Sequence, residues 1–133
     1  MYLLDTNACI QVLNRTSVAL VAHLAERDPS EVRLCSVVKA ELVYGARRSR
    51  RVAENLKLLR RFFAPFDSLP FDDRCAEEYG SIRSELEAQG EPIGPNDLLI
   101  AAIARAHKAV LVTHNLGELS RVAGLAIEDW ETL

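Results

Sequence analysis

The sequence lacks any long apolar run. No segment approaches the ~20 consecutive apolar residues that a membrane-spanning helix needs. Residues 1–5 read MYLLD, without the basic residues and the apolar stretch that mark a signal peptide. We therefore expect neither a signal peptide nor an association with a membrane.

Cysteine is also scarce. The three cysteines, Cys9, Cys35 and Cys75, are odd in number, lie far apart and form no CxxC pair. This spacing argues against a disulfide framework and against a thiolate metal site, and it is typical of a protein in a reducing cytoplasm. Each cysteine has apolar neighbours, so we expect all three to be small core residues.

Repeats, low-complexity tracts and linkers rich in proline or glycine are absent as well. The 133 residues fall within the usual size of one domain. A content of 49% hydrophobic and 26% charged residues is ordinary for a globular protein. We therefore expect residues 1–133 to form a single domain with one core.

Positive charge is not in excess overall, because the formal net charge is −3. It is concentrated, however, in residues 47–61, where seven cations accompany a single acid, Glu54. These cations are Arg47, Arg48, Arg50, Arg51, Lys57, Arg60 and Arg61. A local patch is sufficient for contact with phosphate groups. The run predicts either a phosphate-binding surface, centred on the four arginines of residues 47–51, or a solvated helix end.

Short apolar runs alternate with amphipathic segments along the chain. The runs predict strands over residues 2–4, 32–35 and 109–113, a weaker strand over residues 125–127, and an edge strand within residues 66–71. Apolar residues at helical spacing predict helices over residues 9–13, 18–24, 37–46, 52–63, 72–89 and 96–107. Ser36 is expected to cap the third helix, and Asp72 to start the fifth.

Strands separated by helices imply a mostly parallel sheet that is covered by helices on both faces. The predicted fold class is therefore α/β. In sheets of this kind, ligands bind at the carboxyl ends of the strands.

Three acidic residues interrupt the apolar pattern around them. Asp5 stands at the carboxyl end of the first predicted strand. Glu41 has mostly apolar or small residues three and four positions away on its helix, and Asp97 lies on the apolar face of the most apolar helix. Because an unpaired charge in such a place is costly, each acid is expected to meet a cation or to line a water-filled cleft.

Each of these acids also has a simpler structural interpretation. Asp5 is suited to cap the helix that follows it, and Glu41 to form a surface ion pair. Asp97 stands in a first helical turn, where a carboxylate interacts favourably with the helix dipole. Capping does not explain, however, why Asp97 faces the apolar side of its helix.

The ends at which parallel strands pass into helices share one edge of the sheet. Carboxylates that crowd there repel one another unless a cation neutralises them. Oxygen ligands suit Mg²⁺ or Mn²⁺, and no cysteine and histidine cluster in the sequence favours zinc. An acidic metal site beside a basic patch is typical of enzymes that cleave phosphodiesters. In such enzymes the metal activates water, and arginines hold the nucleic-acid strand.

Four motifs in register resemble those of the PIN-domain family, in the form found in VapC toxins of toxin–antitoxin pairs. They are LLDTN at residues 3–7, SVVKAELVYG at 36–45, GPNDLLIAA at 94–102 and VTHNLGEL at 112–119, followed by EDW at 128–130. Each motif alone is weak, but four in order across nearly the whole chain are specific.

The resemblance implies a parallel sheet flanked by helices and a ribonuclease that depends on Mg²⁺ or Mn²⁺. Its RNA substrate would be tRNA, rRNA or mRNA, cut to leave a 5′-phosphate and a 3′-hydroxyl. Asp5, Glu41 and Asp97 would be the catalytic residues and the metal ligands. The arginines of residues 47–51 would contact the RNA.

The resemblance also implies partners. A cognate VapB-like antitoxin commonly threads a segment across the active site of such toxins. The chain is therefore expected as a homodimer or as a toxin–antitoxin hetero-oligomer in the cytoplasm.

The fourth motif departs from the family pattern. Many members carry a further Asp where this chain has Asn115. The resemblance therefore leaves open whether the site holds one metal ion or two. Glu118 follows Gly117 instead of the usual Arg. The residues with implied supporting roles are Thr6, Asn7, Thr113, Asn115 and Glu118. His114 adjoins the predicted site, whereas His23 and His107 are expected to be structural or surface residues.

Two other protein classes are alternatives for this sequence. A signalling receiver domain is also α/β with an acidic edge, but it needs paired acids after the first strand and a lysine after a late one. Here Asp5 is alone and no lysine closes the strand at residues 109–113. The second alternative is a PIN-like protein that binds RNA or a partner without cutting, and Asn115 keeps this alternative open.

Overall fold

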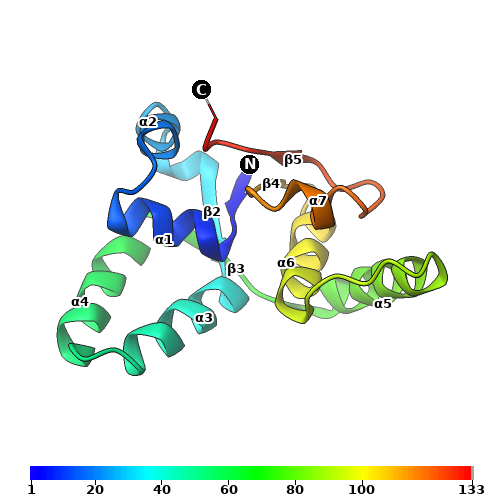
Figure 1. Ribbon diagram of the computed structural model, residues 1–133, viewed down its shortest axis with the longest axis horizontal. Coiled ribbons are helices and arrows are strands. Elements are labelled where there is room, and N and C mark those ends of the chain that lie inside the picture. The colour runs from blue at the N-terminus through cyan, green and yellow to red at the C-terminus, as the bar shows by residue number, and fades with distance from the viewer. Residues whose placement is uncertain (133) are drawn as a thin grey trace.

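The computed structural model describes residues 1–132. Strands and helices alternate along this part of the chain (Figure 1). The strands are β1 (Tyr2–Leu4), β2 (Val32–Cys35), β3 (Asp67–Leu69), β4 (Val110–Val112) and β5 (Ile127–Glu128). The helices are α1 (Thr6–Asn14), α2 (Val18–Ala25), α3 (Ser36–Arg47), α4 (Val52–Phe63), α5 (Asp73–Ala88), α6 (Pro95–Ala106) and α7 (Leu116–Leu119), with a short 3₁₀ helix, η1 (Pro29–Glu31).

The five strands form one parallel sheet in the order β3-β2-β1-β4-β5. β1 lies in the middle, where Tyr2 is paired with Val32 on one side and with Val110 on the other. The predicted α/β class is therefore confirmed, and β3 is the expected edge strand. Because all pairings are parallel, the carboxyl ends of the strands meet at one edge of the sheet.

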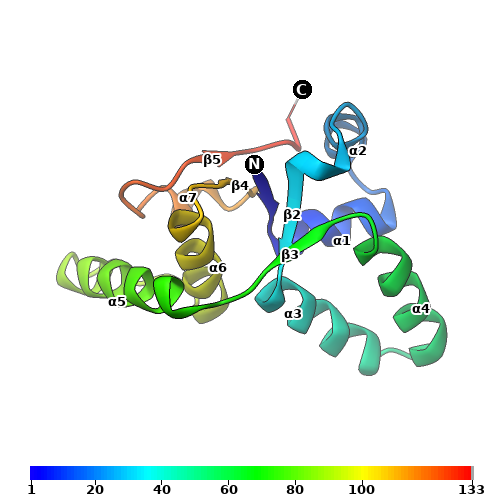
Figure 2. The same ribbon diagram turned by 180° about the vertical axis from the view of Figure 1, so that it is seen from behind.

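The core is built from the central strands and from α6. Leu3, Leu34 and Leu111 are completely buried on three adjacent strands, and residues 100–104 of α6 are at most 1% exposed. Burial of each of these three leucine side chains stabilises the fold by about 1.5–3 kcal/mol. All three cysteines are buried, as expected. In both views of the ribbon, α1, α3 and α4 lie on one side of the central strands and α5 and α6 on the other (Figures 1 and 2).

Side-chain caps explain where several helices begin. Asp5, Ser17 and Asp72 each accept a hydrogen bond from a backbone N–H in the first turn of α1, α2 and α5. Pro95 is the first residue of α6, where its missing N–H costs nothing. Gly90 has a φ of 69° and ends α5 in a left-handed conformation that suits glycine.

Some local predictions were wrong. Ser36 does not cap α3: Cys35 occupies the cap position without a side-chain hydrogen bond, because β2 passes directly into the helix. The last strand covers Ile127–Glu128 and not residues 125–127. The first helix begins at Thr6, three residues before the predicted start, and Asp5 is the cap that the sequence suggested. The short helices η1 and α7 were not predicted, since three or four residues are too few to show a helical period.

Trp130 anchors the segment that follows β5. Its side chain is 1% exposed, and its ring lies 5.1 Å from the ring of Tyr2 and 5.5 Å from that of His23, with the Arg27 guanidinium 4.3 Å above it. His23 is therefore a structural residue, as expected. Glu131 follows Trp130, and its backbone N–H donates a hydrogen bond of 2.9 Å to Oδ1 of Asp129.

Among the described residues, no single helix has both the length and the apolar character needed to cross a bilayer. Within residues 1–132, one pair of helices, α1 and α2, meets these length and composition criteria when taken together, but the pair is bent by 97°.

Candidate active site

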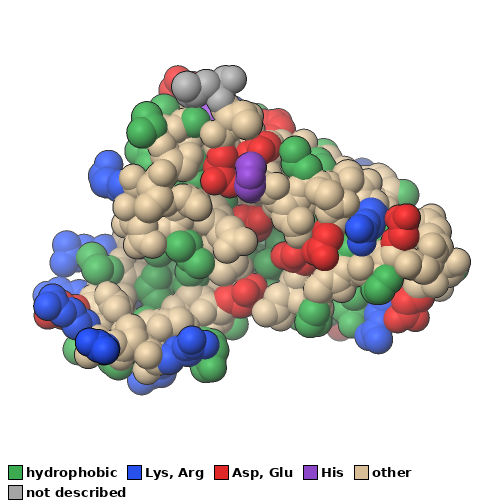
Figure 3. Space-filling view, in the orientation of Figure 1, with side chains coloured by type: hydrophobic (Ala, Val, Ile, Leu, Met, Phe, Trp, Pro, Cys, Tyr) green, Lys and Arg blue, Asp and Glu red, His purple; other side chains and the backbone are tan. Residues whose placement is uncertain are grey.

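Asp5, Glu41 and Asp97 line a single cleft of about 260 Å³. Asp5 directly follows β1, Glu41 lies on the helix that follows β2, and Asp97 stands in the first turn of α6. The complete lining is Asp5, Thr6, Asn7, Glu41, Gly94, Pro95, Asn96 and Asp97. Acidic side chains gather in the middle of the face shown in Figure 3. The parallel sheet thus brings carboxylates from three distant segments to one place.

Asp5 is only 4% exposed, and its Oδ1 accepts a hydrogen bond of 2.8 Å from the N–H of Ala8. Burial raises the pKa of this carboxyl from 3.8 to about 6. The hydrogen bonds from Ala8 and from the Thr113 hydroxyl oppose the rise, while the charges of Asp97 and Glu131 add to it. Asp5 is therefore both the cap of α1 and a buried acid that its surroundings do not neutralise.

Glu41 belongs to α3 and lines the cleft, and its side chain is partly buried. The hydroxyl of Thr6 donates a hydrogen bond of 2.8 Å to its Oε1. This contact joins α1 to α3 across 35 positions of sequence and orients the carboxylate. Among the described residues, no cation lies within ion-pair distance of Glu41, so the surface ion pair considered from the sequence is absent.

Asp97 is partly buried and does not cap its helix, because Gly94 occupies that position without a side-chain bond. Burial raises the pKa of Asp97, and the charges of Glu118 and Glu41 raise it further. The hydrogen bond from Asn115 opposes this rise. The carboxylate of Asp97 is therefore repelled by those of both Glu41 and Glu118.

Asn115 connects the fourth motif to the cleft. Its Nδ2 donates hydrogen bonds of 3.2 Å to Asp97 and 3.0 Å to Glu118. Its backbone N–H donates to the hydroxyl of Thr113 at 3.0 Å. The amide thus holds two carboxylates in place without adding charge, and Thr113 acts on the third, Asp5.

Sequence reasoning missed a second acidic cluster beside the cleft. His114 Nδ1 lies 2.9 Å from Oδ2 of Asp129 and 3.5 Å from Oε2 of Glu131. The hydrogen bond to Asp129 and the charge of Glu131 raise the pKa of the exposed imidazole. The sequence signal was slight, because two of these residues follow β5 and lie more than ten positions from His114. The run EDW at residues 128–130 was the only hint.

The basic cluster lies away from the cleft, at the end of α3 and in the turn to α4. Arg47, Arg48, Arg50 and Arg51 are all exposed. Lysine and arginine side chains gather over this turn in Figure 3. Arg51 forms an ion pair of 3.4 Å with Glu54 that is exposed on both sides and therefore weak. The remaining positive charge is open to a ligand.

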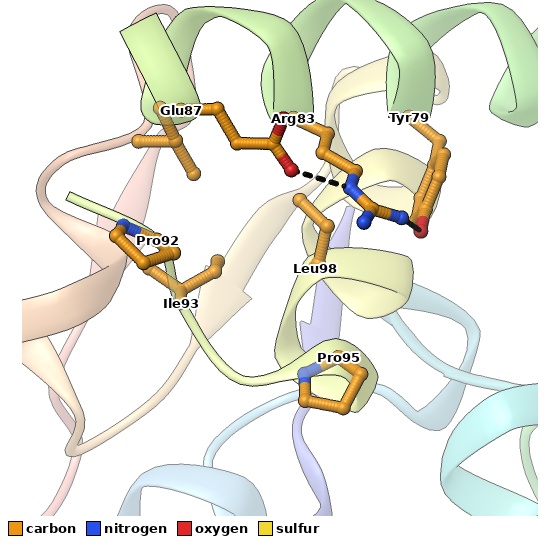
Figure 4. Close-up of a pocket in the computed structure, with 8 residues that line it drawn as sticks. Tyr79, Arg83, Glu87, Pro92, Ile93, Pro95 and Leu98 are labelled. Carbon is orange, nitrogen blue, oxygen red and sulfur yellow. Dashed lines mark hydrogen bonds and ion pairs between the residues drawn. The ribbon is translucent and has the colours of Figure 1, made fainter. Parts of the chain in front are cut away.

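A neighbouring pocket between α5 and the start of α6 has different chemistry (Figure 4). Apolar side chains such as Ile93 and Leu98 form much of its wall. Its two charged residues, Arg83 and Glu87, are paired with each other at 2.9 Å, and Arg83 also donates to the hydroxyl of Tyr79. This pocket offers no free acid or base, so the carboxylate cleft is the better candidate for catalysis.

The donor set of the cleft fits a hard divalent cation. The three side chains that converge are carboxylates. The charge of Asp97 raises the pKa of Asp5, and the charge of Glu41 raises the pKa of Asp97. A cation placed between them removes this repulsion and supplies the missing counter-charge. Carboxylate oxygens are the ligands that Mg²⁺ and Mn²⁺ prefer.

Known proteins are similar to this chain in sequence and in fold. Residues 2–125 match the family model described as "PIN domain". The chain is 38% identical over 129 residues to the "tRNA(fMet)-specific endonuclease VapC" of Shigella flexneri, covering 97% of each chain. It is 36% identical over 132 residues to "Ribonuclease VapC2" of Rickettsia felis, covering 98% of each.

Solved structures agree with these relatives. A crystal structure of VapBC2 from Rickettsia felis, bound to a DNA fragment from the promoter, superposes with a TM-score of 0.90 at 36% identity, covering 97% of this chain and 98% of the other. DNA-bound VapBC from Salmonella typhimurium gives a TM-score of 0.91 at 34% identity, covering 97% of each chain.

Proposed function

The chain belongs to the PIN domain family and is a ribonuclease of the VapC type, and from this premise we propose that it cuts RNA with Mg²⁺ held by Asp5, Glu41 and Asp97. The observation that carries the proposal is the convergence of these three carboxylates on one cleft. When bound, the cation activates water and offsets charge on the scissile phosphate. Mn²⁺ has the same ligand preferences and is expected to substitute.

The protein's own groups preorganise this site. Thr6 orients Glu41, Asn115 orients Asp97, and the N–H of Ala8 fixes Asp5. These hydrogen bonds hold the three carboxylates in position, so that little reorganisation is needed at the moment of reaction. Asn115 and Glu118 complete the edge of the site.

We propose structured RNA, such as tRNA, as the substrate class, with mRNA and rRNA as other candidates. The Shigella flexneri relative is named for tRNA(fMet), and the exposed arginines suit the phosphates of a folded RNA. The expected products are a 5′-phosphate and a 3′-hydroxyl. A substrate of this class fits a cytoplasmic location.

A VapB-like antitoxin is the proposed partner. The neighbouring structures are VapBC complexes. An apolar groove of about 370 Å³ lies between α1, α3 and α4 and reaches Glu41 in the cleft. Ile10 and Leu58 in its wall are 39% and 50% exposed. An apolar antitoxin segment that covered this groove would end beside the carboxylates and close the site.

Removal of divalent metal tests the proposed reaction. We expect purified protein to cut tRNA in Mg²⁺, to stop in excess EDTA, and to resume when Mg²⁺ or Mn²⁺ is restored, as read on a denaturing gel. Binding of RNA in EDTA should persist, because the arginines do not need the metal. Cleavage that continues in EDTA would contradict the proposal, and binding without cleavage in Mg²⁺ would favour the non-cutting alternative.

Replacing Arg47 and Arg51 together by Ala tests the basic cluster. Each phosphate contact contributes about −0.7 (single strand) to −0.9 (duplex) to the slope of log affinity against log salt, so loss of two contacts should flatten the slope by about 1.4–1.8. The measurement is filter binding or fluorescence anisotropy at several salt concentrations. As a control, Arg83 and Arg121 are replaced by Ala, which removes the same charge elsewhere. An unaltered slope in the Arg47 and Arg51 variant excludes this patch from the RNA interface.

A further inference from the structure

Asp72, Cys75 and His107 form a second cluster of metal-ligating groups, remote from the carboxylate cleft. A carboxylate oxygen, the thiol sulfur and one ring nitrogen lie within 4.8 Å of one another. Asp72 and Cys75 stand at the start of α5, and His107 directly follows the last residue of α6. His107 is ten residues from Asp97, which corresponds to about 15 Å along the helix axis.

We propose that these three residues bind a transition-metal ion, with Zn²⁺ as the preferred ion. Thiolate, imidazole and carboxylate are the ligands of tetrahedral zinc sites, in which water can fill the fourth position. They are a poor match for Mg²⁺, which requires oxygen ligands. The two sites of the protein therefore differ in the kind of metal that they select.

The surroundings of His107 support this assignment. Its Nε2 is buried and has no hydrogen-bond partner among the described residues, which is costly for a polar atom unless something binds it. His23 also has a buried, unpartnered ring nitrogen, but its ring stacks on Trp130 and belongs to no cluster of metal-ligating groups among residues 1–132. His23 is thus a natural control for a histidine without a metal site.

Asp72 and Cys75 are placed to act as ligands without unfolding α5. The cap of the helix uses Oδ1 of Asp72, which accepts from the N–H of Cys75 at 3.1 Å, and the exposed carboxylate has a second oxygen. The thiol of Cys75 makes only a weak contact of 3.7 Å with the carbonyl of Pro70. Binding releases the thiol proton to solvent, because the thiolate is the ligand.

A bound ion would link the beginning of α5 to the end of α6 through its ligands. These helices are neighbours, and α6 carries Asp97 in its first turn. The side chain of Arg74 already donates to the carbonyl of Ala106 at the same junction. We therefore expect Zn²⁺ to stabilise the fold, and RNA cleavage to remain when the cluster is removed.

Cobalt spectroscopy tests the site. The protein is kept in excess Mg²⁺, the cation proposed for the carboxylate cleft, and is titrated with Co²⁺. We expect a near-ultraviolet thiolate-to-cobalt absorption that saturates at one equivalent and is displaced by Zn²⁺. Zinc should also raise the melting temperature by roughly 5 °C. Folded protein without this absorption would overturn the proposal.

Variants assign the absorption to its ligands. Cys75→Ser and His107→Gln should abolish it, whereas His23→Gln should retain it. Asp72→Asn keeps the helix cap, because Asn caps as well as Asp, and should weaken Co²⁺ binding at least about tenfold. Circular dichroism checks the fold of each variant. Absorption that persists in Cys75→Ser, or wild-type affinity in both His107→Gln and Asp72→Asn, would contradict the site, and neither result would bear on the carboxylate cleft.

Discussion

Replacing Asp97 by Asn is expected to lower the rate of RNA cleavage roughly a thousandfold, or about 4 kcal/mol in the activation barrier, while the fold stays intact. The change removes one of three carboxylates from the proposed metal site but preserves the shape of the side chain. The amide oxygen of the new Asn can still accept the hydrogen bond from Asn115. The loss of a favourable dipole interaction at the start of α6 costs only about 0.3–1 kcal/mol.

Asp73→Asn is the matched control, because Asp73 also stands in the first turn of a helix but is exposed and outside the cleft. Its cleavage rate should equal that of the wild type. Single-turnover cleavage in Mg²⁺ gives the comparison, and circular dichroism shows whether each variant is folded. A folded Asp97→Asn protein that cuts RNA at the wild-type rate would refute the role given to this residue.

Replacing Asp5 by Asn is expected to abolish cleavage and, in the absence of metal, to stabilise the protein at neutral pH. Burial raises the pKa of Asp5 from 3.8 to about 6 in the folded chain. The folded state therefore binds its proton more tightly than the unfolded state, and stability is lost as pH rises through this interval. Ionisation of Asp5 costs up to about 3 kcal/mol above it, whereas Asn keeps the cap of α1.

Thermal unfolding in EDTA measures this effect. At pH 7 the Asp5→Asn variant should melt roughly 5 °C or more above the wild type, and the gap should close near pH 4, where the wild-type carboxyl is protonated. Mg²⁺ should then stabilise the wild type but not the variant. Asp28→Asn, a change at an exposed cap, should give no gain. A gap that is absent at pH 7 or independent of pH would show that Asp5 is not a strained charge.

The fold could be predicted because its main signals are local. Apolar runs such as residues 109–113 and the almost continuously apolar helix of residues 96–107 give strand and helix with little ambiguity. Alternation of the two leaves a parallel sheet as the simplest arrangement. Caps were less predictable: Asp72 caps its helix, but Ser36 does not, since a direct passage from strand to helix leaves no turn residue to cap.

The carboxylates of the cleft could be located because they conflict with their surroundings. An acid on an apolar helix face, like Asp97, is costly unless the fold supplies a reason. Contacts between such residues were not predictable, because the bonds from Thr6 to Glu41 and from Asn115 to Asp97 depend on side-chain directions that only the packed structure fixes.

The two clusters that contain His107 and His114 could not be predicted from the sequence. His107 and Cys75 each look like common core or helix-end residues, and 32 positions separate them. They meet only because α5 and α6 pack side by side. His114 meets Asp129 for a similar reason, after Trp130 has anchored the segment beyond β5. Spacing along the chain carries no information about such pairs.

Anomalous diffraction from crystals soaked in Mn²⁺ tests the shared cation most directly. Manganese should appear in the cleft, roughly 2 Å from oxygens of Asp5, Glu41 and Asp97. The peak should vanish from crystals of the Asp97→Asn protein or be strongly reduced. An empty cleft in crystals of a protein that cuts RNA in Mn²⁺, or manganese bound only beside His114, would contradict the account.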